Sequence, residues 1–297
     1  MKCLFIYNPN SGKGRVAKKE HYIEEKLKTK YNKVDIMRTE HPHHASIIAS
    51  ENYNKYDTFV VSGGDGTLNE VINAIAEKEN APVIGYIPTG TTNDVAHSLK
   101  IPRNIKKAVK VILNGKIFNH DIFKVNDKYG IYVCATGLGC EISYETKQTH
   151  KKFWGRLAYF FSGAKKIFKS KPLHIKLKHD NEIIEQNCAL LLIVNSRYVG
   201  GFKINKNARL DDGYVDVVMI ECPKKNKFSL LSMFSIAKLF LFGLNYNKKK
   251  RRVTYLRLKD FEIELKNNAE INLDGECGQN GSFKFKSLEK GVKIYIP

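Results

Sequence analysis

Strand-like and helix-like segments alternate along the first 120 residues, and this alternation limits the possible folds more than any other feature of the sequence. Residues 3–7, CLFIY, are apolar at every position, and residues 58–61 and 82–86 are also strand-like. Continuous apolar runs indicate strands that are buried on both faces. Helical segments such as residues 16–30 separate them. This order predicts an α/β domain with a parallel sheet and helices on both faces, in which ligands bind beyond the carboxyl ends of the strands.

The pattern of secondary-structure signals changes after about residue 123. Short strand-like runs now dominate, and Gly, Asn and Asp residues join most of them. Such a pattern is typical of an antiparallel β-sandwich. Helical segments at about 153–168 and 228–244 interrupt it. We therefore predict an α/β domain over residues 1–123 and a β-sandwich domain over 124–297, whose final strand could return to the first domain.

The composition points to an acidic partner. Fifty Lys and Arg residues against thirty Asp and Glu give a net charge of +20, which suits a nucleic acid or an anionic membrane surface. A bias toward Lys and Asn is the simpler explanation. No nucleic-acid recognition motif is present, so we expect no nucleic acid partner. The six scattered cysteines, the lack of a signal segment and the lack of a run of about 18 apolar residues predict a cytoplasmic protein.

Two of the predicted strands are followed directly by loops that suit phosphate. The segment N-P-N-S-G at 8–12 offers Ser11 and backbone N–H groups as donors, although an ordinary loop would explain it equally well. The segment G-G-D-G-T at 63–67 lets the backbone and the positive end of a helix approach a polyphosphate. A lone carboxylate would repel phosphate, so Asp65 fits a site that also holds Mg²⁺ or its water shell. A structural turn is the simpler alternative.

A third loop, P-T-G-T-T-N-D at 88–94, follows the next predicted strand. Asp94 or Asn93 could be an ordinary helix N-cap. Because the carboxyl ends of parallel strands share one edge of a sheet, this loop and the G-G-D-G-T loop should face the same crevice. Together they could hold a phosphate chain and a metal ion.

These three motifs and D-G-E at 274–276 resemble, in the same order, the motifs of the diacylglycerol kinase catalytic family, which includes bacterial lipid kinases and the sphingosine and ceramide kinases. The resemblance extends from Asn8 to Glu276 and is nearest to the soluble diacylglycerol kinases of Gram-positive bacteria. Thr89 departs from the apolar residue that many members have between Pro and Gly. G-G-D-G-T alone also occurs in NAD kinases and phosphofructokinases, so the other three motifs make the distinction.

The resemblance implies a nucleotide site and a catalytic site. It implies that Asp65 and Asp94 organise Mg²⁺ at the phosphates, through water. A lipid hydroxyl must lose a proton as it attacks the γ-phosphoryl group, and the family assigns that base to D-G-E. The sequence leaves Asp274 and Glu276 both open. The implied ATP contacts are Asn8, Pro9, Asn10, Ser11, Gly12, Thr39, Gly64, Asp65, Gly66, Thr67, Leu68, Asn69, Glu70 and Thr91.

A second metal site is implied by the acidic turn at 209–216, which taken alone is most simply a hairpin turn. In similar kinases this segment holds a structural Mg²⁺ through one carboxylate and flanking carbonyl groups. Carried over to this sequence, the ligands are Asp212 and the carbonyls of Arg209 and Tyr214. An ion that keeps several waters fits so few protein oxygens.

The helical segments combine aromatic and basic residues, as in residues 151–169 and in 228–244 followed by the basic run 248–252. Such helices fit transient docking on an anionic membrane, or they simply cover the β-sandwich. The resulting hypothesis is that the chain is a kinase that transfers phosphate from ATP to a membrane lipid, with diacylglycerol as the first candidate. An NAD kinase and a catalytically silent lipid- or nucleotide-binding regulator are the alternatives. A homodimer is expected only by analogy.

Overall fold

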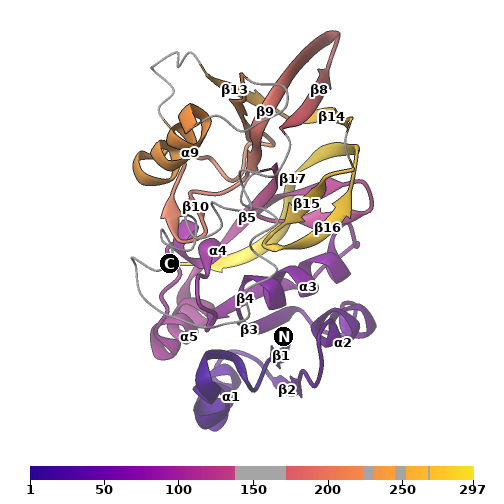
Figure 1. The fold of residues 1–297 in the computed structure, drawn as a ribbon. Helices are drawn as coiled ribbons and strands as arrows, with labels where there is room; N and C mark the ends of the chain where they lie inside the picture. The colour runs from indigo at the N-terminus through magenta and orange to yellow at the C-terminus, as the bar shows by residue number, and fades with distance from the viewer. Residues whose placement is uncertain (138–171, 224–229, 245–251, 267) are drawn as a thin grey trace.

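Within the described residues, one continuous sheet of fifteen strands joins an α/β half at the N-terminus to a β-rich half (Figure 1). The structure, a computed structural model, describes residues 1–137, 172–223, 230–244, 252–266 and 268–297. The predicted helical segment at 153–168 lies outside the described residues.

The α/β half is built on parallel strands, as the apolar runs predict. They are β1 (Lys2–Tyr7), β2 (Lys33–Arg38), β3 (Thr58–Gly63) and β4 (Val83–Pro88). In the sheet they lie in the order β2-β1-β3-β4, and every neighbouring pair is parallel. β3 is buried at all six positions, which explains why its sequence does not alternate.

Helices cover both faces of these strands, which confirms the predicted α/β class. Side chains that alternate along β1 divide between the two faces, so Phe5 shares one apolar cluster and Ile6 another. The first cluster includes residues of α1 (Glu20–Lys28) and α5 (Ile105–Asn114), and the second includes residues of α2 (His44–Asn52), α3 (Asp65–Ile75) and α4 (Asp94–Ser98). Two 3-10 turns, η1 (Ser11–Gly14) and η2 (Ala17–Lys19), precede α1.

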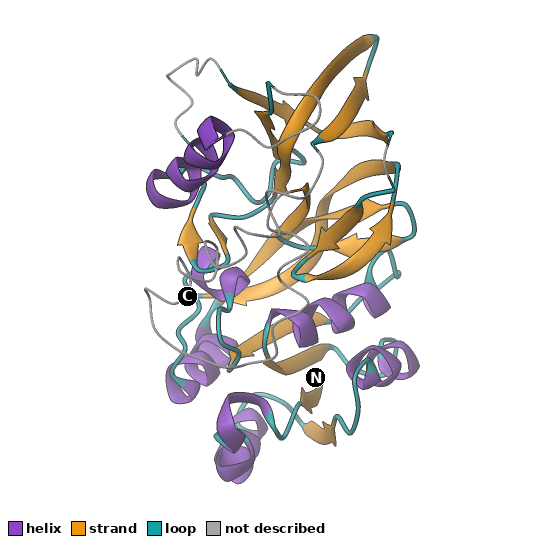
Figure 2. Ribbon diagram, viewed as in Figure 1, coloured by secondary structure: helices purple, strands orange, loops and turns teal. Residues whose placement is uncertain are grey.

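The β-rich half is antiparallel, as predicted (Figure 2). Its interior includes three stacked rings, Phe123, Phe261 and Phe285. The strands are β5 (Lys116–Val125), β6 (Lys128–Gly130), β7 (Val133–Gly137), β8 (Leu173–His179), β9 (Glu182–Val194), β10 (Tyr198–Val199), β11 (Phe202–Lys203), β12 (Val215–Glu221), β13 (Val253–Leu258), β14 (Asp260–Leu265), β15 (Glu270–Leu273), β16 (Glu276–Asn280) and β17 (Phe283–Ile296).

The last strand belongs to both halves. β17 pairs in antiparallel fashion with β14 and β5, and near its end it lies parallel to β4, with Ile294 opposite Ile84. β5 has 10 residues against 14 in β17, and residue 123 falls inside it. The two halves are therefore joined through hydrogen-bonded strands, which holds the loops of one half at a fixed place relative to the other.

One helix of the β-rich half lies within the described residues. It is α9 (Leu230–Phe242), inside the predicted segment 228–244, and it packs on the outside of β9, β11 and β12. Within the described residues, no helix combines the length and the apolar character that crossing a membrane requires.

Candidate functional site

The three predicted phosphate loops meet at the carboxyl ends of β1, β3 and β4. The backbone N–H groups of Thr89 and Gly90 donate to the carbonyl of Gly63 at 2.9 and 3.2 Å, and Asn8 N–H donates to Ser62 O at 3.2 Å. Parallel strands end at one edge of the sheet, so loops far apart in sequence become neighbours there. The loops that the sequence places at one edge of the sheet are therefore neighbours in the structure.

The loop after β1 also touches the loop after β4. The hydroxyl oxygens of Ser11 and Thr89 lie 2.9 Å apart, and a Cβ at Gly12 would lie 3.0 Å from Thr89 O. Gly12 has φ of 59°, in the left-handed region that favours glycine. Thr89, which departs from the apolar residue of the family pattern, thus gains a hydroxyl partner within the site.

Gly90 lies in close contact with the G-G-D-G-T loop, because a Cβ there would lie 2.5 Å from Gly64 Cα and 2.8 Å from Asn93 Oδ1. We expect Gly90→Ala to separate the two loops, to weaken ATP binding at least about tenfold and to cost about 1–3 kcal/mol of stability. Titration calorimetry with ATP and thermal unfolding would measure both. Gly64→Ala, whose Cβ would meet Gly90 Cα at 3.4 Å, should lower the unfolding temperature less. Equal losses in both variants would contradict this account.

Asp65 and Asp94 form a chain of carboxylates that hold backbone N–H groups. Asp65 accepts from the N–H groups of Asp94 and Val95 at 3.0 and 3.3 Å, at the start of α4. Asp94 in turn accepts from Gly200 and Gly201 at 2.6 and 2.8 Å. Burial raises the pKa of Asp65 above its usual range, and these N–H donors oppose that shift. Both side chains thereby fix the relative positions of three loops around the crevice.

The donor set around the crevice suits Mg²⁺ that arrives with a nucleotide. Among the described residues, no cluster of three or more His, Cys, Asp or Glu side chains could hold a metal ion alone. Mg²⁺ usually keeps several waters and is bound through one or two carboxylates and substrate phosphates. Asp65 and Asp94 are the carboxylates of these loops. Asp94 is 1% exposed and accepts N–H groups on both oxygens, so it would reach the ion only through water, and the role of both residues at Mg²⁺ stays a prediction.

The two carboxylates of D-G-E have different surroundings. Asp274 is 3% exposed, and its carboxylate accepts from the N–H groups of Ile131, Tyr132 and Val133 at 2.6, 3.0 and 2.9 Å. Asn69 Nδ2 donates to it at 2.6 Å. Burial raises the pKa of Asp274 to about 6, although the four donors lower it. Asp274 therefore anchors the D-G-E turn to the start of β7 and to α3.

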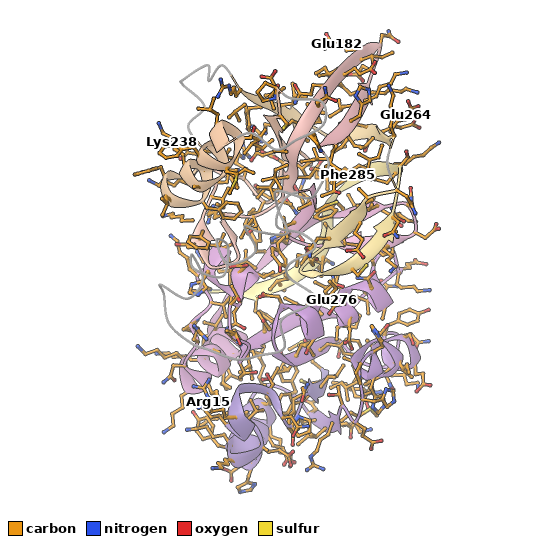
Figure 3. The ribbon with its side chains drawn as sticks, in the orientation of Figure 1. Arg15, Glu182, Lys238, Glu264, Glu276 and Phe285 are labelled. Carbon is orange, nitrogen blue, oxygen red and sulfur yellow. The ribbon has the colours of Figure 1, made fainter. Side chains whose placement is uncertain are left out.

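Glu276 lies on the exposed side of the same turn, beside α3 (Figure 3). A Cβ at Gly66 would lie 2.8 Å from Glu276 Oε1, so this carboxylate touches the backbone of the glycine loop. A Cβ at position 66 would displace the end of the Glu276 side chain from this place. The structure thus brings a solvent-accessible carboxylate of the β-rich half to the phosphate loop of the α/β half.

Other predicted contacts occupy the borders of the crevice. Glu70 accepts from the N–H groups of His43 and Ala45, both at 3.2 Å, and so holds the start of α2. Thr39, at the end of β2, is buried and donates its N–H to Tyr7 O at 2.9 Å. The remaining predicted ATP contacts, Asn8, Pro9, Asn10, Gly64, Thr67, Leu68 and Thr91, lie on the same three loops and on the first turn of α3. Leu68 is a core residue, and Thr91 is exposed.

The residues predicted to hold a structural metal also lie together, although the contacts that join them involve the Arg209 side chain and the Tyr214 N–H group and not the predicted carbonyl oxygens. Asp212 Oδ1 accepts from Tyr214 N–H at 3.2 Å, and Asp212 Oδ2 lies 3.5 Å from Arg209 Nε. The same carboxylate forms an ion pair with Arg257 of β13, whose guanidinium lies over the Tyr214 ring. A Mg²⁺ ion at Asp212 would have to compete with these two cations, so the site stays a prediction.

Sequence patterns did not indicate several residues that shape the site. The pair Gly200–Gly201, between β10 and β11, supplies the N–H groups that Asp94 binds. Asp121 is fully buried and accepts from the N–H groups of Gly213 and Lys290, both at 2.7 Å. The glycine pair is visible in the sequence and could have been noted as a candidate loop. No local pattern points to Asp121, because its partners lie 92 and 169 residues away in the chain.

Comparisons with known proteins agree with this arrangement. A model of the diacylglycerol kinase catalytic domain matches residues 2–125, and a model of the YegS C-terminal NAD kinase beta sandwich-like domain matches residues 133–294. A diacylglycerol kinase from Staphylococcus saprophyticus is 32% identical over the whole of this chain and 95% of its own length. The chain belongs to the diacylglycerol kinase family.

Two further relatives also match this chain over nearly their whole length. A diacylglycerol kinase from Staphylococcus aureus is 32% identical over the whole chain and 92% of its own length. A solved structure from Bacillus anthracis str. Sterne, proposed to be a diacylglycerol kinase, superposes with a TM-score of 0.83 at 25% identity and covers 100% of this chain and 95% of its own. The family assignment thus rests on both halves of the chain, and it makes this protein a lipid kinase.

Proposed function

We propose that this lipid kinase transfers the γ-phosphoryl group of ATP to the hydroxyl group of diacylglycerol and so forms phosphatidic acid. The observation that supports this best is the position of Glu276, an exposed carboxylate in contact with the glycine loop. The names of the relatives supply the acceptor, because they are diacylglycerol kinases.

The nucleotide would bind across the three loops. Backbone N–H groups at the start of α3 and in the loops after β1 and β4 would donate to phosphate oxygens, and the positive end of α3 favours the same anion. Asp65 and Asp94 are the residues that would hold Mg²⁺ through its waters. When bound, the ion neutralises charge on the phosphates during transfer.

Glu276 is the better candidate for the base that accepts the proton of the lipid hydroxyl. Asp274 is surrounded by four donors and is buried, so an acceptor hydroxyl has no room beside it. Glu276 is open to solvent on the side of the phosphate loop. We infer that Asp274 positions the turn and that Glu276 receives the proton. The acceptor would come from a membrane that this cytoplasmic enzyme visits transiently.

The direct test measures ADP release with ATP, Mg²⁺ and diacylglycerol in mixed micelles that contain an anionic lipid. We expect lipid-dependent turnover, a radiolabelled phosphatidic acid product, and loss of turnover when EDTA removes Mg²⁺. Turnover that does not depend on the lipid, across several lipid hydroxyls, would contradict the proposal.

NAD is the second acceptor to test, because the model that matches residues 133–294 is described as NAD kinase beta sandwich-like. Phosphorylated NAD and no lipid product would favour an NAD kinase. Vesicle binding with no phosphorylated product of either kind would favour a silent regulator. These three outcomes separate the candidate functions in one set of assays.

A further inference from the structure

The outer face of α9 exposes a row of large apolar side chains. Phe234 is 76% exposed, Leu241 53% and Phe242 69%, and Lys238 between them is also exposed. Residues spaced by three, four and seven positions lie on one face of a helix. With Leu231, which is 55% exposed, these side chains form the α9 stripe.

The opposite face of α9 is firmly attached to the β-rich half. Ile236 is fully buried and Leu239 is 4% exposed. Ser232 Oγ donates to Glu221 O at 2.8 Å, and the N–H of Leu244 donates to Ile204 O at 2.7 Å. The helix is thus apolar on both sides, and the packed side holds the α9 stripe outward. A single-sided amphipathic surface helix would instead place charged residues there.

The segment that contains α9 is unusually basic. Residues 222–251 include eight Lys or Arg residues and no Asp or Glu. The segment connects the neighbouring antiparallel strands β12 and β13, and the N–H of Glu221 donates to Arg252 O at 2.9 Å. It therefore leaves and re-enters the sheet at one place. The α9 stripe is exposed and apolar, and all charged residues of its segment are cationic. These two features complement a surface that has anionic groups on the outside and an apolar interior.

We propose that the α9 stripe docks on the surface of an anionic phospholipid bilayer. Phe234, Leu241 and Phe242 would enter the boundary between headgroups and acyl chains, and Lys238 would contact the headgroups. A second copy of the chain fits the stripe less well, because each copy would bring the same excess of positive charge. This inference rests on the proposed function for its purpose, since a lipid kinase has to reach its acceptor.

The helix is also linked to the catalytic crevice. The ring of Phe240 on α9 packs edge-on against Phe202 of β11, with ring centroids 5.7 Å apart. Gly200 and Gly201, immediately before Phe202, donate their N–H groups to Asp94. In Figure 1, α9, β10 and α4 lie on the same side of the molecule. A docked α9 would therefore hold the Asp94 side of the crevice toward the membrane.

Sedimentation with sucrose-loaded vesicles tests the docking without any turnover. Wild-type protein should bind vesicles of phosphatidylglycerol and phosphatidylcholine, and binding should weaken in about 1 M salt. The double variant Phe234→Glu and Phe242→Glu should bind at least about tenfold more weakly. Ile47→Glu, which charges a residue 46% exposed on α2, is the matched control and should bind as wild type does. Phosphorylation of a short-chain, water-soluble diacylglycerol should be equal in all three proteins.

Equal vesicle binding by wild type and the double variant would overturn the proposal, as would an equal loss in Ile47→Glu. A wild-type dimer that the double variant converts to monomer, with vesicle binding unchanged, would assign the stripe to a second copy instead. The experiment tests the docking and the proposed function independently of each other. Lost vesicle binding in the double variant supports docking even if no lipid is phosphorylated, and turnover of the soluble substrate supports the kinase even if no vesicle is bound.

Discussion

Replacing Glu276 by glutamine should lower kcat about 10²–10⁴-fold and leave the fold intact. The substitution keeps the size of the side chain and its approach to Gly66, but an amide does not accept the proton of the lipid hydroxyl. Glu276 is exposed, so no buried network is broken. The measurement is ADP release with diacylglycerol, together with the thermal unfolding temperature and the affinity for ATP, which should both stay near wild-type values.

The matched control is Glu270→Gln, at the start of β15 in the same hairpin as Glu276. Its activity should stay within about twofold of wild type, because this carboxylate is not part of the D-G-E turn. A kcat of Glu276→Gln close to wild type would remove the base role from this residue. If Asp274→Asn alone then lost activity, the choice between the two carboxylates would be reversed.

The fold could be predicted from the sequence because its determinants are local. The apolar segment 3–7 and the strand-like segments 58–61 and 82–86 are buried strands, and the glycine loops follow two of them where the parallel order requires. The short apolar runs and the turn residues after residue 123 predicted antiparallel strands, and the strands there are antiparallel. The sequence allowed a final strand that returns to the first domain, and β17 does lie beside β4. Its pairing partner, residue 84 opposite residue 294, is a long-range contact that no local pattern specifies.

The chemistry of individual carboxylates could not be predicted in the same way. Asp65, Asp94 and Asp274 all appear in loops typical of metal or phosphate sites, yet each one binds backbone N–H groups of another segment. The donors to Asp94 and Asp274 come from residues more than a hundred positions away. Asp212 likewise pairs with Arg257, 45 residues later. Motif spacing identifies the residue types, whereas the fold decides which of them face a ligand.

Asp274→Asn should change how stability depends on pH, and the sign of that change is determined by burial. The folded-state pKa of Asp274 is raised from 3.8 to about 6, because desolvation outweighs its four hydrogen-bond donors. The folded state then holds this proton more tightly than the unfolded state. The stabilisation is complete below about pH 4 and is lost as the pH rises through 6. A shift of about two pKa units corresponds to about 3 kcal/mol.

Urea unfolding of wild type and Asp274→Asn between about pH 4 and pH 7 measures this contribution, because every other titrating group is common to both proteins. The free energy of unfolding of wild type minus that of the variant should fall by about 3 kcal/mol as the pH rises. Asp127→Asn, at an exposed residue of the turn between β5 and β6, is the matched control. A difference that rises with pH would mean that the three N–H groups at 131–133 and Asn69 stabilise the carboxylate more than burial penalises it. Asp274 would then be a permanently charged anchor of the D-G-E turn, and any activity lost near pH 6 would have to come from another group.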